Sequence, residues 1–446
     1  MKKMRSNAEQ EANTLPKWNF ARNMMPSDTE IVKGRGIYVY DNNGKEYMDL
    51  TSQTLNLNLG HRHPAIMKAV IDKLSEDGFT YYVSPRFGNR HVSELAERLV
   101  SLAPGGLNRV NLHLCNGSDA NEDAIKRARK YYNGSRMAIV SFKGSFLGTS
   151  CESISASGGN FYKEDCVGGS KDYIFIDPVM PNRIPKGSSI EEQIQCRLEE
   201  FEAIAKTRKD ICAIIMELVP FNAGVIVLPK EYVRGIERIC RENDIAMLVD
   251  EVQTAFGWCG DVFASNVYAI KPDVITLGKG LTAGFPALAA TVFKEKYDVL
   301  NGGTSENTFG AQTLGCVAAL ANMNYLTSSG IMEEIPEKHG RFMSHLNRMK
   351  EAYPFIGDVR GIGLMFGIDF VFDDGSPDRD INIDVYRAAF DRGLMVNVST
   401  SQKGMHNVIS IKPPLTITVN EIDEAMGRFD DATRSVSDAR GRKKSP

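Results

Sequence analysis

Seven short apolar segments between residues 110 and 293 constrain the fold of this chain more than any other feature. Stretches with helical spacing, such as 191–208 and 231–243, separate several of them. Apolar strands that alternate with helices form a mostly parallel sheet covered by helices on both faces. We therefore predict an α/β fold whose sheet is built from VNLHLC (110–115), MAIVSF (137–142), DYIFID (172–177), ICAIIME (211–217), IAMLVD (245–250), DVITLG (273–278) and ALAATVF (287–293).

Small, aromatic or ionisable residues end or follow several of these segments. Ligands of such sheets bind beyond the carboxyl ends of the strands, so we expect these residues to form one site. In chain order they are Gly117, Ser118, Phe146, Glu217, Asp250 and Lys279.

Asp250 and Lys279 carry the most specific chemistry of this set. A lysine amine that forms a Schiff base, together with an acid that keeps a pyridinium nitrogen protonated, is what a pyridoxal phosphate site requires. Each residue also has a structural interpretation, Asp250 as a helix cap and Lys279 as a solvated lysine. A phosphate loop is excluded, because Asp273 and Gly280 stand where that motif needs glycine and serine or threonine.

The sequence around Asp250 resembles a family signature. It reads Asp-Glu-Val-Gln-Thr over 250–254, continues with Phe256-Gly257, and is followed by a lysine 29 positions after the aspartate. This pattern is similar to the class III pyridoxal phosphate aminotransferases, the group of ornithine and 4-aminobutyrate aminotransferases, from about residue 35 to about 430. The resemblance implies fold type I, the cofactor pyridoxal phosphate, and ping-pong transfer of an amino group from an amine to a 2-oxo acid or other carbonyl acceptor.

The resemblance also implies roles for individual residues. Lys279 would bind the cofactor and move the proton, and Asp250 would hold the ring nitrogen. Phe146 would stack on the ring, Val252 would pack on its opposite face, and Gln253 would donate to its phenolic oxygen.

Three further residues match residues that bind the cofactor phosphate. Gly117 and Ser118 begin a predicted helix, where free backbone amides can hold a phosphate, although a turn and cap would look the same. Thr308 matches a threonine that reaches the phosphate from the neighbouring subunit. The resemblance therefore implies a homodimer with shared active sites.

The substrate side departs from the family. Ser410 stands where many relatives have an arginine that grips a substrate carboxylate, and Lys412 faces the same side of that strand. Glu217 is retained, but Pro220 and Phe221 replace polar or small residues, and Trp258 falls where another arginine is usual. We therefore predict a donor other than an ordinary α-amino acid, such as a terminal amine or an amino sugar. Arg86 is a candidate for the acceptor carboxylate, or simply a solvated arginine.

The domain organisation follows the same patterns. We predict an N-terminal arm and hairpin over 1–60 that packs on the small domain, with the turn at Asn42-Asn43-Gly44. A large cofactor-binding domain over 61–325 and a small α+β domain over 326–433 follow. Within the small domain, 407–418 reads as an edge strand because of its prolines, and a final helix with a Thr418/Glu421 capping box runs through Phe429. Residues 434–446 are predicted to be disordered.

Composition excludes several classes of partner. The net charge of −3 favours neither nucleic acid nor an anionic membrane, and no apolar run reaches the roughly 18 residues of a membrane span. The first residues lack the apolar segment of a signal peptide, so we expect a cytoplasmic protein. The eight cysteines form no CxxC pair and the histidines do not cluster, so we expect reduced thiols and no metal.

Two rival functions stay open at this stage. A racemase or epimerase, or a phospho-lyase, would use the same lysine and aspartate, and a requirement for a 2-oxo acid would distinguish an aminotransferase from them. A non-catalytic protein on the same fold would not need Lys279, Asp250, Gln253 and Thr308, all of which are present.

Overall fold

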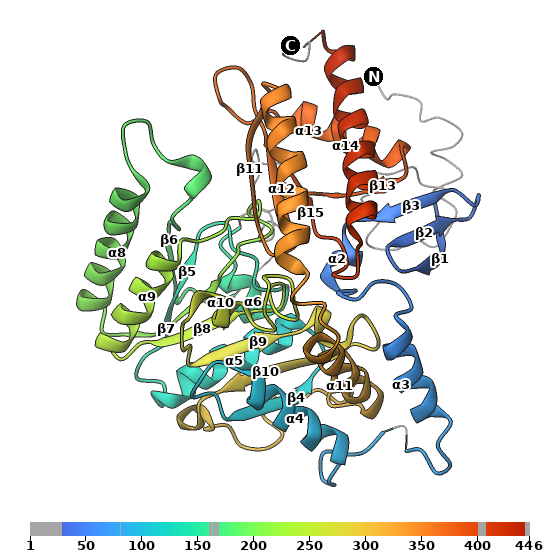
Figure 1. The fold of residues 1–446 in the computed structure, drawn as a ribbon. Helices are drawn as coiled ribbons and strands as arrows, with labels where there is room; N and C mark the ends of the chain where they lie inside the picture. The colour runs from blue at the N-terminus through green and yellow to red at the C-terminus, as the bar shows by residue number, and fades with distance from the viewer. Residues whose placement is uncertain (1–28, 81, 160–162, 164–168, 400–406, 442–446) are drawn as a thin grey trace, which may run out of the picture.

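The computed structural model describes residues 29–80, 82–159, 163, 169–399 and 407–441. A large domain with the central sheet lies below a smaller domain in Figure 1, and the N-terminal strands lie beside the smaller one. The candidate site residues lie at the carboxyl ends of the sheet strands, on the side that faces the small domain. The small domain therefore lies next to the candidate site.

The central sheet contains all seven predicted strands. Their order is β4-β10-β9-β8-β7-β5-β6. Four neighbouring pairs are parallel, and only β10 runs antiparallel to its neighbours β4 and β9, so the prediction of a mostly parallel sheet is confirmed. The strands are β4 (Arg109–Leu114), β5 (Ala138–Phe142), β6 (Tyr173–Ile176), β7 (Ile211–Glu217), β8 (Ala246–Asp250), β9 (Val274–Leu277) and β10 (Ala289–Phe293).

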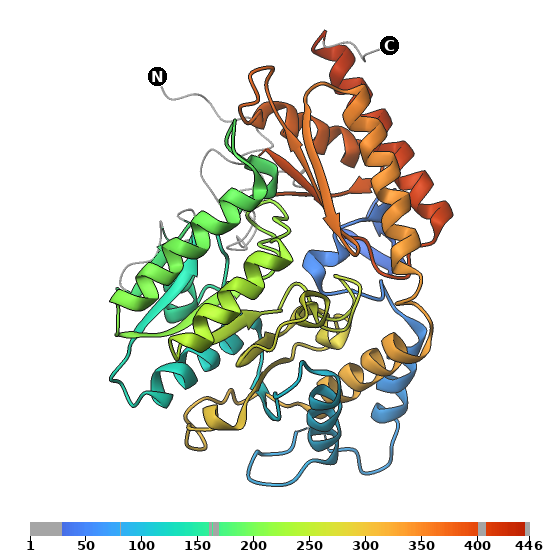
Figure 2. The ribbon, with the colours of Figure 1, turned by 60° about the vertical axis from the view of Figure 1, so that its left-hand side comes forward.

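Helices cover both faces of this sheet (Figure 2). Helix α5 (Gly117–Tyr131) packs on one face, against β7 to β10, while α9 (Lys230–Glu242) packs on the other with α8 (Ile190–Thr207). Alternate residues of β7 belong to the two apolar layers, Ala213 and Ile215 to one and Ile214 and Met216 to the other. A strand buried on both faces explains why these segments read as continuous apolar runs.

Further helices complete the large domain. Helix α11 (Thr313–Ser328) packs against α3 (Pro64–Leu74) and α4 (Arg90–Leu102), and its last turn contains the predicted domain boundary at 325/326. The short elements are α2 (Ser52–Leu55), α6 (Cys151–Ala156), α10 (Ala264–Tyr268), η1 (Pro181–Arg183), η2 (Lys279–Thr282) and η3 (Glu295–Tyr297).

The small domain contains a second sheet with the order β11-β12-β15-β14. Strand β15 is therefore interior, and the prediction of an edge strand over 407–418 is wrong. The prolines at 413 and 414 follow the last residue of β15, so they do not prevent it from pairing with β14. The elements are β11 (Ile356–Ile362), β12 (Met365–Phe370), β14 (Asn397–Val398), β15 (Val408–Ile411), α12 (Ile335–Ala352) and α13 (Arg379–Asp391).

The N-terminal strands extend the small domain. β2 (Tyr38–Asp41) and β3 (Glu46–Asp49) form the predicted hairpin, in which Gly44 takes the positive φ of 81°. β1 (Ile31–Arg35) pairs with β2, and β3 pairs in parallel with β13 (Leu394–Met395). The residues that follow β3 therefore enter the space between the two domains.

The last helix is longer than predicted. Helix α14 (Val419–Ala439) begins with the expected capping box of Thr418 and Glu421 but continues ten residues beyond Phe429. The prediction of disorder from residue 434 is therefore wrong for the described part of the tail, up to 441. Val436 and Ser437 are buried, so the amphipathic face of the helix continues past the point where apolar residues become sparse.

None of the helices in the described part of the chain is long and apolar enough to cross a membrane. The cytoplasmic location stays a prediction.

Candidate active site

Three adjacent strands end in a row of polar side chains. Glu217 in β7 lies beside Asp250 in β8, and Asp250 lies beside Thr276 in β9. All three strands are parallel, so these side chains share the carboxyl end of the sheet, and Lys279 follows directly after β9. The sequence predicted this gathering of Glu217, Asp250 and Lys279, because the position at a strand end is a local property.

Asp250 is buried and firmly held. Asn121 Nδ2 donates to its Oδ2 at 2.7 Å, and the backbone N–H of Val252 donates to its Oδ1 at 2.8 Å. Thr276 Oγ1 in turn donates to Asn121 Oδ1 at 2.7 Å. Burial raises the pKa of Asp250, and the hydrogen bonds from Asn121 and Val252 oppose that shift. The result is an oriented carboxyl group at the base of the site.

Asn121 lines the cavity and holds Asp250, and the sequence did not predict it. It lies in the second turn of α5 and is 1% exposed. Its amide links Asp250 to Thr276 and to the carbonyl of Leu147. The sequence offered one signal for Asn121, a polar residue on the sheet-facing side of a helix. That signal did not identify its hydrogen-bond partners, because they lie 26 to 155 positions away in the chain.

Lys279 lies in an unusual backbone conformation. Its φ is +43°, which costs a non-glycine residue free energy and occurs mainly where surrounding structure enforces it. Gly278 before it approaches Gly117, and an added Cβ there would lie 3.4 Å from the Gly117 nitrogen. Burial lowers the pKa of Lys279 to about 8, although the charges of Asp250 and Glu217 act in the opposite direction. A substantial fraction of this amine is therefore uncharged and nucleophilic near pH 8.

The amino end of α5 meets the loops after β8 and β9. The Asn116 side chain caps the helix by accepting from Asp119 N at 3.1 Å, and the helix begins at Gly117. A Cβ on Gly117 would lie 2.7 Å from Val252 Cγ1, so only glycine fits here without movement. Ser118 Oγ accepts from Thr149 N at 3.1 Å. The first residues of α5, Gly117 and Ser118, thus line one cavity, and the amino end of a helix suits a phosphate.

Hydrogen bonds link Glu217 to the loops around it. Phe146 N donates to its Oε2 at 3.0 Å, and Gln253 Nε2 lies 3.5 Å from its Oε1. Burial, and after it the charge of Asp250, raise the pKa of Glu217 to about 8. This pKa favours the protonated form of Glu217 at neutral pH.

These residues surround a cavity of about 490 Å³. Seven of the predicted residues line it: Gly117, Ser118, Phe146, Asp250, Val252, Gln253 and Lys279. Asn56, Asn121 and Thr282 line it as well and were not predicted. The structure thus brings together in one cavity all the predicted cofactor-binding residues except Thr308, while their roles stay predictions.

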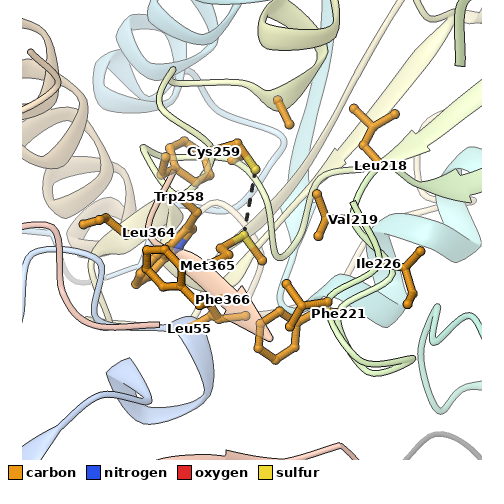
Figure 3. Packing of buried hydrophobic residues seen from close by; sticks show 14 of the residues in the cluster. Leu55, Leu218, Val219, Phe221, Ile226, Trp258, Cys259, Leu364, Met365 and Phe366 are labelled. Atoms are coloured by element: carbon orange, nitrogen blue, oxygen red, sulfur yellow. Dashed lines mark hydrogen bonds between the residues drawn. The ribbon is translucent and has the colours of Figure 1, made fainter. Parts of the chain in front are cut away.

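Other predicted residues lie elsewhere. Trp258 is 1% exposed and packs in the apolar cluster between the domains, near Cys259, Leu364 and Met365 (Figure 3), so the prediction of a substrate contact there is not supported by its position. Arg86 and Thr308 are exposed and do not line the cavity of their own chain. Ser410 is buried within β15, paired with Gly367 and Asn397.

Comparison with known proteins identifies the family. The model of the class III aminotransferases matches residues 20–433. The chain belongs to the class III aminotransferases. This aminotransferase is 33% identical to an acetylornithine aminotransferase of Caldanaerobacter subterraneus subsp. tengcongensis, over 91% of this chain and 95% of the relative. It is 31% identical to a leucine/methionine racemase of Thermococcus litoralis, over 92% and 91%.

A solved structure supports the same assignment. An amine transaminase from an uncultivated Pseudomonas species, in its PLP-bound form, is similar with a TM-score of 0.85 and 26% identity, over 94% of this chain and 99% of that one. This class III aminotransferase therefore has the fold of the PLP-dependent transaminases, fold type I, and its cofactor is pyridoxal phosphate.

The cavity fits that cofactor. Gly117 and Ser118 at the amino end of α5 line it, Asp250 offers a buried acceptor, and Lys279 offers an amine. When bound, pyridoxal phosphate accepts the electrons released at the substrate carbon that carries the nitrogen. The chain moves an amino group from an amine donor to a carbonyl acceptor.

Proposed function

We propose that the donor of this aminotransferase is an amine with no arginine-held carboxylate beside it, such as a terminal amine or an amino sugar. The observation that supports the proposal is the composition of the cavity wall. Among the described residues, none of those that line the cavity is an arginine. A planar guanidinium is the group that binds a carboxylate with two parallel hydrogen bonds, so an α-amino acid would lack that clamp here.

The residues near the small domain support the same proposal. Ser410, at the position where relatives carry arginine, is small and 1% exposed. Phe221 presents an aromatic ring on the loop after β7 and is 4% exposed (Figure 3). Neither side chain carries the positive charge that would hold a carboxylate next to the donor amine.

Roles in the reaction follow from the positions of the side chains. We propose that Lys279 carries the proton between the substrate carbon and the cofactor, and that Asp250, oriented by Asn121, keeps the ring nitrogen protonated. Gly117 and Ser118 would hold the phosphate, Phe146 and Val252 the ring. Gln253 would donate to the phenolic oxygen.

We also propose that the active protein is a homodimer. Thr308 and its neighbour Phe309 are exposed, and Phe309 lies edge-on to the exposed Tyr82 with ring centroids 6.5 Å apart. Phe87, 71% exposed, follows on the same segment as Tyr82. Exposed aromatic residues next to a predicted phosphate-binding threonine suit a second copy that receives Thr308 into its site.

The experiment that tests the donor class is a half-reaction. The purified holoprotein is mixed with α-amino acids, terminal amines and amino sugars in turn, without any oxo acid, and the cofactor absorbance is followed. We expect terminal amines or amino sugars to convert the cofactor to its pyridoxamine form and pyruvate or 2-oxoglutarate to restore it. Faster conversion by common α-amino acids would contradict the proposed donor class.

The racemase relative supports one second candidate. A racemase or epimerase, like a phospho-lyase, would consume its substrate without stoichiometric conversion of the cofactor and without any oxo acid. The same half-reaction detects this outcome when substrate loss is measured beside the absorbance.

A further inference from the structure

The turn over residues 52–55, which forms α2, has a left-handed backbone. The φ angles of its four residues are 48°, 47°, 65° and 65°, and none of the four is glycine. Left-handed residues other than glycine cost free energy and usually occur singly. Such strain persists only where the surrounding structure enforces it, and it gathers at functional sites. The turn over 52–55 is therefore a candidate for a role in the active site.

Contacts with the rest of the fold hold this turn in place. Ser52 Oγ donates to the carbonyl of Lys412 at 2.8 Å, and Gln53 Nε2 donates to Asp49 Oδ2 at 3.1 Å. Leu55 is fully buried in the apolar cluster between the domains (Figure 3). The residue that follows the turn therefore has a fixed position.

That residue is Asn56, which lines the cavity with a free amide oxygen. Its Nδ2 donates to the carbonyl of Gln53 at 2.7 Å. A backbone carbonyl only accepts hydrogen bonds, so the amide nitrogen of Asn56 has to face it, and Oδ1 is the other branch of the amide. Within the described part of the chain, Oδ1 of Asn56 has no hydrogen-bond partner. Asn56 thus offers an uncharged acceptor to a ligand of the cavity.

Thr282 brings a hydroxyl group to the same cavity. It is the last residue of η2, which begins at Lys279, and it is 2% exposed. Its Oγ1 makes no hydrogen bond to any residue that the structure describes. Covering such a hydroxyl with an apolar ligand costs free energy, whereas a ligand that bonds to it avoids that cost.

The segments that carry these two side chains are bound to each other. Asn58 Nδ2 donates to Asn322 Oδ1 at 3.1 Å, and Asn322 Nδ2 donates to the carbonyl of Gly280 at 2.7 Å. A Cβ on Gly284 would overlap Leu57 Cδ2, so the segment 56–58 also packs on the loop after η2. The two segments therefore lie together beside the cavity, directly after the lysine.

We propose that Asn56 and Thr282 bind hydroxyl groups of the amino donor, so that the donor is a hydroxylated amine such as an amino sugar or an amino polyol. This inference rests on the proposed function and decides between its donor classes. A hydroxyl group donates to the Asn56 oxygen and can donate to or accept from the Thr282 hydroxyl. A carboxylate has no proton to donate, and an alkyl chain leaves both atoms unpaired.

The test compares two donors of the same shape. 2-Amino-1,3-propanediol carries two hydroxyl groups, and 3-aminopentane carries methyl groups in their places. Each is mixed with the holoprotein at subsaturating concentration without any oxo acid, and the rate of cofactor conversion is followed by absorbance. We expect the wild type to react about tenfold faster or more with the diol, because the alkyl chains leave the polar atoms of Asn56 and Thr282 unpaired.

Two variants assign that preference to the two side chains. Thr282→Val and Asn56→Leu remove the polar atoms and keep the approximate shape of each side chain. The matched control is Thr254→Val, which removes a buried hydroxyl that has no partner among the described residues and does not line the cavity. We expect the preference for the diol to fall about tenfold in each of the two variants and to stay within about twofold of the wild type in the control.

A purely structural role would give a different result. The amide of Asn56 also bonds to the turn over 52–55, so loss of that turn would slow both donors alike and leave the ratio of their rates unchanged. An unchanged ratio in either Thr282→Val or Asn56→Leu would overturn the proposal. So would a wild-type protein that reacts with 3-aminopentane as fast as with the diol.

A binding measurement separates this inference from the proposed function. The variant Lys279→Met, loaded with pyridoxal phosphate, lacks the amine that moves the proton, so calorimetric titration with the two amines measures binding without turnover. We expect the diol to bind about tenfold more tightly than 3-aminopentane, and adding Thr282→Val to remove most of this difference. Equal binding of the two amines would overturn the inference. If no amine converts the cofactor of the wild type, the proposed function fails, and the calorimetric difference still decides the role of Thr282.

Discussion

At the scale of single residues, Lys279 shows how position creates reactivity. Its amine lies near two carboxyl groups, but burial outweighs their attraction and lowers its pKa to about 8. Its backbone has a positive φ, and Lys279 lines the cavity. This conformation costs a non-glycine residue free energy, so the surrounding structure has to hold it.

This pKa predicts how cofactor capture depends on pH. An amine reacts only in its uncharged form, so the rate at which the apoprotein captures pyridoxal phosphate rises with pH, bends near pH 8 and levels above it. Stopped-flow absorbance of the apoprotein mixed with the cofactor measures this profile.

Glu217 titrates in the same range, with a pKa raised to about 8, and needs its own control. Glu217→Gln removes that group and keeps its shape. The bend persists in Glu217→Gln if Lys279 causes it. A profile that becomes flat in this variant would assign the bend to Glu217 instead.

At the scale of elements, the site depends on three backbone segments that nearly touch. The first turn of α5, the loop after β8 and the turn after β9 meet at Gly117, Val252 and Gly278. This approach requires glycine at position 117, because a Cβ there would overlap the Val252 side chain, and it brings the amino end of α5 close to the turn that carries the lysine.

A methyl group at Gly117 tests this contact. Its Cβ would lie 2.7 Å from Val252 Cγ1, and overpacking of this kind typically costs about 1–3 kcal/mol. We therefore expect Gly117→Ala to retain pyridoxal phosphate roughly tenfold less tightly in equilibrium dialysis. The double variant Gly117→Ala/Val252→Ala is expected to recover most of that loss, whereas equal losses in single and double variants would assign the effect to the helix amides alone.

The end of α14 provides a second prediction at this scale. A chain that stops after residue 434 loses the buried Val436 and Ser437 and the Arg440–Asp384 ion pair. Burial of a valine contributes about 1.5–3 kcal/mol, so we expect a lower melting temperature than that of a chain ending at 441. Thermal unfolding followed by circular dichroism compares the two, and equal melting temperatures would show that the last turns contribute nothing.

At the scale of the whole molecule, the site joins parts that are remote in sequence. The large domain supplies the cofactor residues, and the small domain brings β15 and Lys412 against the loop that carries Phe221. The exposed Thr308 and Phe309 do not reach the cavity of their own chain, so in our proposal a second copy completes each site.

Hybrid dimers test that completion. Lys279→Met removes the amine, and Thr308→Glu brings a negative charge to the proposed phosphate contact, so each homodimer is expected to be nearly inactive. When the two variants are mixed and allowed to exchange subunits, one of the two sites in each hybrid combines Lys279 with Thr308 from the partner. We expect activity to return to roughly a quarter of the wild-type value, since about half of the dimers are hybrids with one intact site. The control is a mixture of Lys279→Met with the double variant Lys279→Met/Thr308→Glu. We expect this mixture to restore no activity, because neither subunit carries Lys279.

The sequence by itself determined the seven strands, the mostly parallel sheet and the residues at or just after its strand ends, such as Asp250 and Lys279. These are local properties, because the pattern of apolar residues in a strand and the residue at its end are recognised from residues adjacent in the sequence. Only the tertiary structure decided that Asn121 orients Asp250, that β15 is interior, that Trp258 belongs to the core and that Lys412 covers Phe221. Each of these features depends either on contacts between residues more than a hundred positions apart or on the order in which strands pair. The packing of the whole chain selects such contacts, and no local sequence pattern does.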